Sequence, residues 1–494
     1  MSIQIHNKTF SYRNPALYFC CICIVLSLYS CRKYLELPAP VTSVNASNVY
    51  NDNSTAIAVV TAIYARMSNT FYDQGPTAIS LYPELSADNL RLFSVNANLN
   101  YTRHYQNELD QRYISVPFWN TLYSIIYSIN TAIEGLSASV NLNIMIRDRL
   151  LGELYFLRAY HYFYLVNLYG DVPLLTTSIY QESIKVPRTA TDEIYTQMLA
   201  DLDIAGKQLD NIYVDETLLN ASSERIRPNM AAVNALTARV NLYMKRYPAA
   251  EAAATKVIEK TAMYTSNIPL SEIFKKNSKE TIWSLQPVKK QFNTDEGELF
   301  VLPDGGPNDV NPLYISDALL NSFEPGDQRK TAWIGHVSVG NQDYSYPAKY
   351  KVKFGDAEVS EYTILLRLAE QYLIRAEARN EQNNTSGAIA DLNVLRSRSR
   401  RDISQQVPNP LPDLPAGLTQ TELRTLILNE RRVELFMEGG HRWFDLRRTG
   451  QIDKIMSKAA VTKNGSWQSF KALYPIPISD ILLSPLLRQN PGYN

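Results

Sequence analysis

Residues 151–169, LGELYFLRAYHYFYLVNLY, carry the pattern that decides the fold. Apolar residues recur there every three or four positions on two neighbouring faces of a helix. A helix that is apolar on two faces has to be buried on both. We therefore expect an inner helix over Leu151–Tyr169, ended by Gly170 and Pro173. The two stripes are Leu154, Leu157, His161, Leu165, Leu168 and Tyr155, Ala159, Tyr162, Val166, Tyr169.

Two later stretches share a plan of helix, short turn and helix. Residues 230–243 are followed, after Lys245-Arg246, by a helical pattern over 248–259. Residues 362–378 are followed, after Asn383-Asn384, by 386–397, with Ser386 as the expected N-cap. Such hairpins cannot bury their own apolar face and therefore stack, as in tetratricopeptide repeats. The predicted fold class is mainly α, a tetratricopeptide-like scaffold.

Other segments complete the predicted organisation. Helices are expected over 56–67, over 118–136, from a capping box at Thr419–Glu422 to Glu438, and around 442–448. Residues 68–112 have little periodicity and are interpreted as loop-rich surface. Residues 265–350 are interpreted as a long irregular excursion with short strands at 281–284 and 333–340 and a turn at 303–307. Long irregular loops are usually functional.

The N-terminus has the form of an export signal. Lys8 and Arg13 precede the apolar run Ala16–Tyr29, which is too short to span a membrane. Leu28-Tyr29-Ser30-Cys31 is similar to a bacterial lipobox, so Cys31 is predicted to be acylated and to become the mature N-terminus. A soluble secreted protein and an uncleaved anchor are the alternatives. All four cysteines lie in the first 31 residues, which excludes disulfides and cysteine-based zinc sites in the rest of the chain.

Composition excludes some functions. The chain of 494 residues is 45% hydrophobic and 20% charged, typical of a globular protein. Lys plus Arg and Asp plus Glu both number 49, and removing residues 1–30 leaves a net charge of only −2. No global field therefore favours nucleic acid as a partner. The 32 tyrosines suit helix seams and ligand surfaces alike.

Groups for catalysis are sparse. Beyond the signal, His104, His161, His336 and His441 stand far apart, and neither phosphate-binding, dinucleotide-binding nor serine-hydrolase motifs occur. His161 lies on a leucine stripe, as a buried core histidine would. We expect no enzyme activity, no cofactor and no metal.

One charged segment resembles a catalytic site most closely. Glutamates four residues apart share a helix face, and paired carboxylates are what glycoside hydrolysis uses. Interleaved arginines would lower the carboxylate pKa values and spoil a general acid. We therefore predict a structural network of salt bridges, with Glu430 buried against an arginine. Its members are Glu430, Arg431, Glu434, Arg442 and Asp445.

Several segments in order along the chain resemble the SusD/RagB family, surface lipoproteins that Bacteroidetes pair with TonB-dependent outer-membrane transporters. The segments are CRKYLELPAP (31–40), FWNTLYSIIYSINTAIEGL (118–136), LGELYFLRAYHYFYLVNLYGDVPLL (151–175), LRLAEQYLIRAEA (366–378), LNERRVELFMEGGHRWFDLRRTG (428–450), YPIPISD (474–480) and QNPGYN (489–494). Gly440 adds one glycine to the family's usual pattern. Loops 68–112 and 286–350 match no particular substrate.

The resemblance implies about four tetratricopeptide-like helix pairs with long irregular loops and a few short strands. The expected divisions are a lipoprotein signal (1–30), a tether (31–49), an N-terminal SusD-like part (50–264) and a C-terminal SusD/RagB part (265–494). It further implies a non-catalytic lipoprotein on the cell outer membrane. Such a protein captures an oligosaccharide or other nutrient and acts as the lid of a SusC-like TonB-dependent transporter. A surface glycoside hydrolase and a tetratricopeptide scaffold for protein interaction are the alternatives.

Ligand capture is predicted to depend on rings in the two irregular regions. A pyranose stacks an apolar C–H face on an aromatic ring, while its hydroxyl groups bond to amides and charged groups. The alternative for each ring is loop packing or contact with a partner. The candidates are Tyr72, Asn89, Arg91, Phe93, Tyr101, Phe292 and Trp333.

Overall fold

The segment with two apolar stripes lies in α6 (Ile144–Tyr169), a helix of 26 residues. The Asn143 side chain caps its start by accepting a hydrogen bond of 2.9 Å from the backbone N–H of Met145. Every residue from 156 to 169 is buried. Gly170 ends the helix with a φ of 74°, a backbone conformation that favours glycine. The predicted inner helix and its stop are confirmed, although the helix begins at Ile144 rather than Leu151.

The computed structural model describes residues 49–68, 75–95, 98–112, 118–355, 358–403 and 407–493. In this part of the chain, the residues from Tyr50 onward form one compact unit. They contain eighteen α-helices and only short strands. The mainly helical fold class is therefore confirmed. The signal segment and Cys31 lie outside the described residues.

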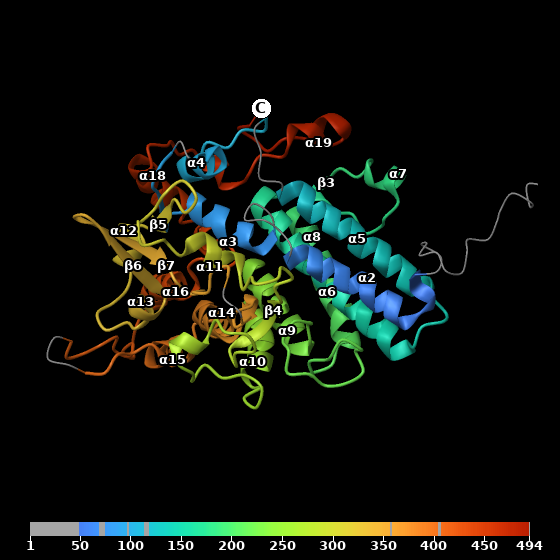
Figure 1. The fold of residues 1–494 in the computed structure, drawn as a ribbon, viewed down its shortest axis with the longest axis horizontal. Helices are drawn as coiled ribbons and strands as arrows, with labels where there is room; N and C mark the ends of the chain where they lie inside the picture. Colours follow the sequence, from blue (N-terminus) through green and yellow to red (C-terminus); the bar gives the residue numbers. More distant parts are fainter. Residues whose placement is uncertain are drawn as a thin grey trace, which may run out of the picture. The chain divides into compact units, whose positions relative to one another are not determined.

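The larger helices form the scaffold. Helix α6 packs against α2, α5 and α8, which Figure 1 draws from blue to green. Further along the chain α9 packs on α10, α10 on α14, and α14 on α15 and α16. The bounds are α2 (Asn53–Ser68), α5 (Phe118–Ala138), α8 (Thr191–Gln208), α9 (Met230–Tyr243), α10 (Tyr247–Ile258), α14 (Leu368–Glu381), α15 (Thr385–Arg398) and α16 (Gln420–Leu435).

Two of these pairs are the predicted hairpins. Lys245, with φ 57°, turns the chain between α9 and α10, and Asn383, with φ 62°, does so between α14 and α15. The N-cap of α15 is Asn384, whose side chain accepts from the backbone N–H of Gly387 at 3.0 Å, so the prediction of Ser386 was wrong. The capping box of Thr419 and Glu422 on α16 is confirmed.

The expectation of a loop-rich surface over 68–112 was wrong for most of the described part. Helix α3 (Gly75–Ser86) and helix α4 (Leu99–Gln106) lie there. All residues of α3 from Thr77 to Ser86 are buried. A helix surrounded on every side has no polar face, which explains the missing period.

The short strands pair as four antiparallel ladders. β4 (Thr281–Leu285) and β6 (Ile334–Val339) confirm the two short strands predicted at 281–284 and 333–340. Residues 363–367, expected as helix, instead form a strand that pairs with β4, and the helix begins only at Leu368. The remaining strands are β1 (Leu90–Leu92), β2 (Val172–Pro173), β3 (Arg188–Thr189), β5 (Leu313–Ile315), β7 (Gln342–Pro347) and β8 (Thr363–Arg367).

Short helices connect the scaffold to its loops. They comprise α7 (Tyr180–Ser183), α11 (Asp295–Phe300), α12 (Asp317–Leu320), α13 (Arg329–Ala332), α17 (His441–Arg448), α18 (Ile452–Thr462) and α19 (Ile478–Leu483), with 3-10 turns η2 (Val49–Asn51), η3 (Leu270–Glu272) and η4 (Ser469–Ala472).

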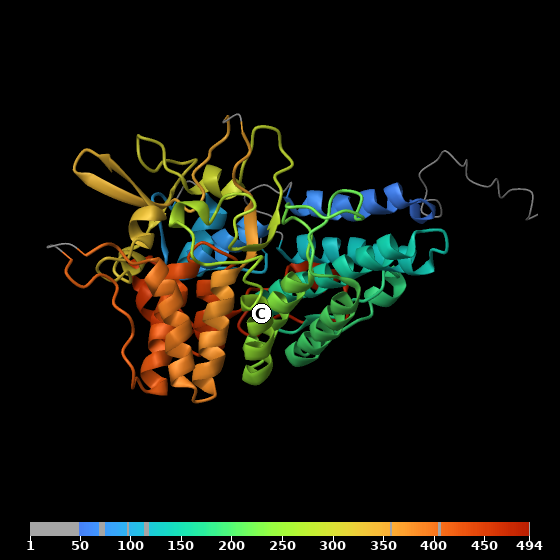
Figure 2. The same cartoon turned by 90° about the horizontal axis from the view of Figure 1, so that it is seen from below.

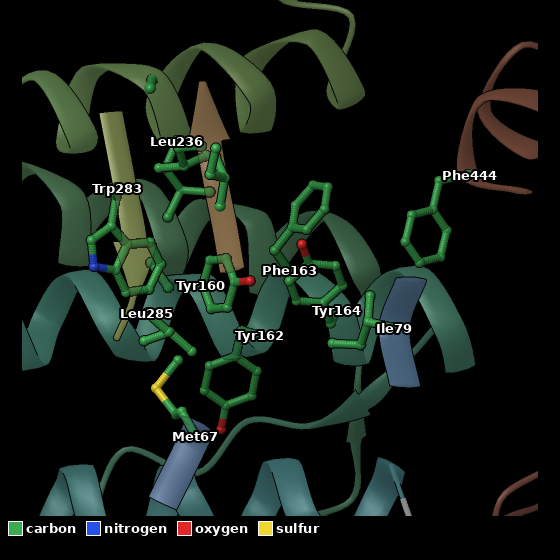
Figure 3. Close-up of a cluster of buried hydrophobic side chains, with 14 of the residues drawn as sticks. Met67, Ile79, Tyr160, Tyr162, Phe163, Tyr164, Leu236, Trp283, Leu285 and Phe444 are labelled. Atoms are coloured by element: carbon green, nitrogen blue, oxygen red, sulfur yellow. The ribbon is translucent and has the colours of Figure 1, made fainter. Parts of the chain in front are cut away.

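The core contains many of the aromatic rings (Figure 3). Trp283 of β4 lies edge-on to Phe156 and Tyr160 of α6, with ring centroids 4.9 and 5.1 Å apart. Its indole N–H donates to the backbone oxygen of Ile226 at 3.1 Å. Edge-to-face pairs of this kind stabilise a core beyond the area they bury. The tyrosines of α6 therefore serve mainly as packing groups.

The irregular segments gather on one side of this unit. Figure 2 shows the β6–β7 hairpin and neighbouring loops on one side of the helical scaffold, with α10, α14 and α15 extending away from them. We call the side that carries β1, β5, β6 and β7 the loop face.

Candidate ligand-binding surface

The structure separates the predicted ring positions into buried and exposed ones. Trp333 and Tyr101 are only 1% and 7% exposed, whereas Phe93 is 48% exposed. Phe292 is half-buried. Tyr72 lies outside the described residues. Trp333 and Tyr101 present no face to a ligand, and their proposed role as platforms was wrong.

Trp333 directly follows α13, and its side chain lies in the core. Its indole N–H donates to the backbone oxygen of Leu270 at 3.1 Å. Phe274 lies edge-on at 5.5 Å between ring centroids, and the ammonium of Lys349 lies 4.9 Å from the ring. Tyr101 packs edge-on against Tyr82 at 5.8 Å.

The two polar candidates also differ. Asn89 is fully buried; its amide donates to Glu84 at 2.7 Å and accepts from Arg432 at 2.9 Å. It holds β1 in place, and its expected contact with ligand was wrong. The side chain of Arg91 is 30% exposed and pairs with the exposed Asp317 at 3.5 Å.

An aromatic cluster, defined as Phe93, Tyr314 and Tyr344, lies on the loop face. The Tyr344 ring is edge-on to both others, with centroids 6.2 Å from Phe93 and 5.3 Å from Tyr314. Both tyrosines are half-buried. Rings that are fixed by one another and partly open to solvent can stack on the apolar face of a sugar.

Paired strands position this cluster. β1 and β5 are antiparallel, and Arg91 pairs directly with Tyr314. Residues that are directly opposite in this way have their side chains on the same face of the sheet. The backbone N–H of Phe93 donates to Pro312 at 2.8 Å and extends the ladder. The two tyrosines were missed from the sequence. The sequence does carry a signal for Tyr314, because this residue stands between the apolar Leu313 and Ile315, as an outward-facing residue of a strand does.

The predicted turn at 303–307 approaches the same place. Gly306 has a φ of 79°, and a Cβ there would come within 2.8 Å of Val339. Only glycine allows both the turn and this close approach to the β6–β7 hairpin.

Phe292 belongs to a second group of rings. Its centroid is 5.0 Å from that of Phe354, which is 57% exposed, and Lys289 lies over the Phe292 ring. A small depression of about 20 Å³ adjoins Phe292 and is lined in part by Met67, Pro76, Thr77, Asp295 and Thr363. It has room for roughly one water molecule.

The strongest features for the hydrolase alternative are Asp295, which lines this depression, and Glu296, which follows it in the chain. Burial raises the pKa of Asp295, and it raises the pKa of the neighbouring Glu296 to about 7. Glu296 is only 3% exposed, however, and accepts a hydrogen bond from Thr363 at 3.0 Å. Ligand pockets usually measure about 300–1,000 Å³, so the depression is too small for a sugar ring between two carboxylates.

The predicted charge network is buried, and its partners come from distant segments. Glu430 is 3% exposed and accepts from Arg329 at 2.6 Å and from Arg396 at 3.3 Å. Glu434 is fully buried and accepts from Arg329, Arg367 and Arg398 at 2.7–2.8 Å. Burial raises the pKa of Glu434, but the three arginines outweigh it and hold the pKa well below its usual range.

The other three predicted members form separate pairs. Arg431 donates to Asp445 at 2.7 Å. Among the described residues, this is the one ion pair that joins two of the five predicted members. Arg442 bonds instead to Asp88 at 2.7 and 3.0 Å. The arginines that complete the network were missed, because β8, α13 and α15 supply them.

The histidines do not assemble a site. Burial lowers the pKa values of His104 and His161 to about 4. His161 is 2% exposed and bonds to the backbone oxygen of Leu157 at 2.6 Å, which confirms it as a core residue. Among the described residues, no group of three or more His, Cys, Asp or Glu side chains could hold a metal ion.

The fold and this surface define a class: a helical-repeat protein that presents rings and polar groups on its loops. Comparison with known proteins identifies the family. Residues 330–493 match the sequence model of the SusD family, and residues 44–242 match one described as starch-binding associating with outer membrane. The chain belongs to the SusD family. The second description agrees with the outer-membrane localisation that the sequence predicts.

Individual relatives extend the match over nearly the whole chain. SusD-like protein P38 of Formosa agariphila is 25% identical over 98% of this chain and 99% of its own length. The starch-binding protein SusD of Bacteroides thetaiotaomicron is 35% identical, but over 26% of this chain and 21% of its own.

Solved structures share the fold. A laminarin-binding SusD-like protein superimposes with a TM-score of 0.72 at 22% identity, covering 90% of this chain and 100% of that one. A SusD homologue from Bacteroides thetaiotaomicron does so with a TM-score of 0.75 at 20% identity, covering 91% and 99%. None of the helices in the described residues combines the length and apolar character that a membrane crossing needs.

Proposed function

We propose that this protein captures a glycan at the outer-membrane surface through the aromatic cluster and Arg91, without catalysis. The observation that carries the proposal is the juxtaposition of Phe93, Tyr314 and Tyr344 on paired strands of the loop face. Membership of the SusD family and the starch-binding and laminarin-binding names of its relatives support a carbohydrate ligand.

Affinity electrophoresis tests this proposal with laminarin and starch as the first glycans. Phe93→Ala and Tyr344→Ala should each weaken binding by more than about 1 kcal/mol, the scale of a lost contact in the centre of an interface. Tyr127→Ala is the matched control, because Tyr127 is a 57% exposed ring on α5 rather than on the loop face. If a glycan is bound and both cluster variants bind it like the control, the binding surface lies elsewhere.

The proposed function includes a partner. A SusC-like TonB-dependent barrel would receive the glycan, with this protein as its lid, and acyl chains on Cys31 would hold it at the membrane. Several chains on one cysteine anchor a protein stably, whereas a single chain is marginal. Support comes from family membership and the lipobox. An adjacent gene for such a barrel, and its co-purification with the acylated protein, are the expected results; a barrel that never co-purifies would contradict the lid.

A further inference from the structure

A second and larger pocket lies among the helices, away from the loop face. Its volume is about 500 Å³, within the usual range of small-molecule sites. It opens between the α9–α10 turn, α14, α16 and the end of α17. Helices α10 and α14 extend away from the β6–β7 hairpin in Figure 2. Its lining consists of Leu242, Tyr243, Lys245, Tyr247, Glu377, Glu381, Arg424, Ile427, Leu428, Arg447, Arg448, Thr449, Gly450 and Gln451.

Both carboxylates of the lining are already neutralised. Glu377 accepts two hydrogen bonds from Arg448, at 2.5 and 2.7 Å. Glu381 accepts two from Arg424, both at 2.7 Å. Such two-bond contacts between a guanidinium and a carboxylate are the strong form of this interaction. Neither acid is therefore available to balance another cation.

Two further cations of the lining have no such partner. Among the described residues, no carboxylate forms an ion pair with Arg447 or Lys245, so the lining has a surplus of two positive charges. The Arg447 guanidinium donates to the backbone oxygen of Asn167. Burial lowers the pKa of Arg447, and no carboxylate of the described residues counteracts this.

The position of Lys245 is fixed by its backbone. It occupies the left-handed region at φ 57°, and its N–H donates to Leu242 at 3.0 Å. Its side chain is exposed at the mouth of the pocket. A flexible ammonium on a fixed turn can reach an incoming anion without a change of fold.

Apolar groups form the rest of the wall. Leu242, Leu428 and the half-buried ring of Tyr247 offer contact to a carbon skeleton, whereas Thr449 and Gln451 bring polar groups. We propose that this pocket binds an organic carboxylate, with Lys245 and Arg447 supplying the positive charge. The carboxylate comes either from a uronic acid in an oligosaccharide or from the C-terminus of a peptide.

Isothermal titration calorimetry at low ionic strength tests this, because screening weakens exposed charges. The probes are trigalacturonate, its methyl ester, N-acetyl-trialanine and its amide. At least one free carboxylate should bind, and its neutral counterpart should not. Lys245→Gln should weaken that binding at least fivefold. Lys256→Gln is the matched control, an exposed lysine of α10 outside the pocket.

The probe that binds identifies the source of the carboxylate. Phe93→Ala should leave this binding unchanged, which separates the pocket from the proposed glycan surface. The proposal is overturned if neither carboxylate binds, if the neutral counterparts bind equally well, or if Lys245→Gln behaves like Lys256→Gln.

Discussion

Replacing Arg367 with methionine should destabilise the fold strongly, because Arg367 stands at the centre of the buried charge network. Its guanidinium is 2% exposed and donates five hydrogen bonds of 2.7–3.2 Å to Glu280, Glu434 and Glu438. Methionine keeps most of the volume but leaves these carboxylates with one cation fewer. Breaking a buried ion pair by removing one partner costs about 3–5 kcal/mol.

That free energy can be expressed as a melting temperature. Unfolding entropy near 60 °C is about 2.1 cal/mol/K per residue, or roughly 0.9 kcal/mol/K for a unit of this length. The expected loss is therefore about 3–5 °C, measured by scanning calorimetry or by circular dichroism.

Arg424→Met is the matched control for this substitution. Arg424 makes the same two-bond contact with a carboxylate, that of Glu381, but its side chain is 49% exposed. Exposed pairs contribute about 0–1 kcal/mol, so its melting temperature should fall by about 1 °C or less. A loss in Arg367→Met no larger than in Arg424→Met would refute the structural account of the network.

Three further predictions concern the core, a buried acid and the anchor. Trp333→Ala should lower the free energy of unfolding by about 3–5 kcal/mol in a denaturant titration, as large-to-small changes in a core do; a surface ring would lose almost none. Burial raises the pKa of Glu84 to about 7 from 4.5. Between these pH values the folded state holds a proton that the unfolded state has released, so stability falls as pH rises through this window. Glu84→Gln should therefore gain about 3 kcal/mol relative to wild type between pH 5 and pH 8 in thermal melts, and an equal difference at both pH values would contradict the shifted pKa. Cys31→Ala should abolish labelling by a fatty-acid probe and release the protein from membranes, and persistent labelling would disprove the lipobox.

The sequence predicted elements whose signals are local. The stripes around Leu154 and Tyr162 identified α6, and the capping box at Thr419 identified the start of α16. Helix α3 was not predicted from the sequence, because a helix that is buried on all sides has no amphipathic period. β8 was read as helix because its short apolar run joins α14 directly, and strand and helix cannot be separated by periodicity over so few residues.

The site was predicted less well, because burial of a loop residue is decided by distant contacts. Trp333 was predicted to stack on a ligand because it lies in an irregular segment, yet Leu270 and Phe274 contact its ring and bury it. Phe93 remained exposed, but the rings beside it come from strands more than two hundred residues away. Likewise, Arg329 reaches Glu434 across 105 positions of sequence, a pairing without any local signal.

Hydrogen exchange measured with and without a bound glycan can locate the glycan on the protein surface. Backbone amides in β1, β5 and β7, which carry the aromatic cluster, should exchange more slowly when laminarin or another bound glycan is present. The amides of α10 and α15, on the helical side, should exchange at unchanged rates. Protection confined to those helices, with none in the three strands, would contradict glycan capture on the loop face.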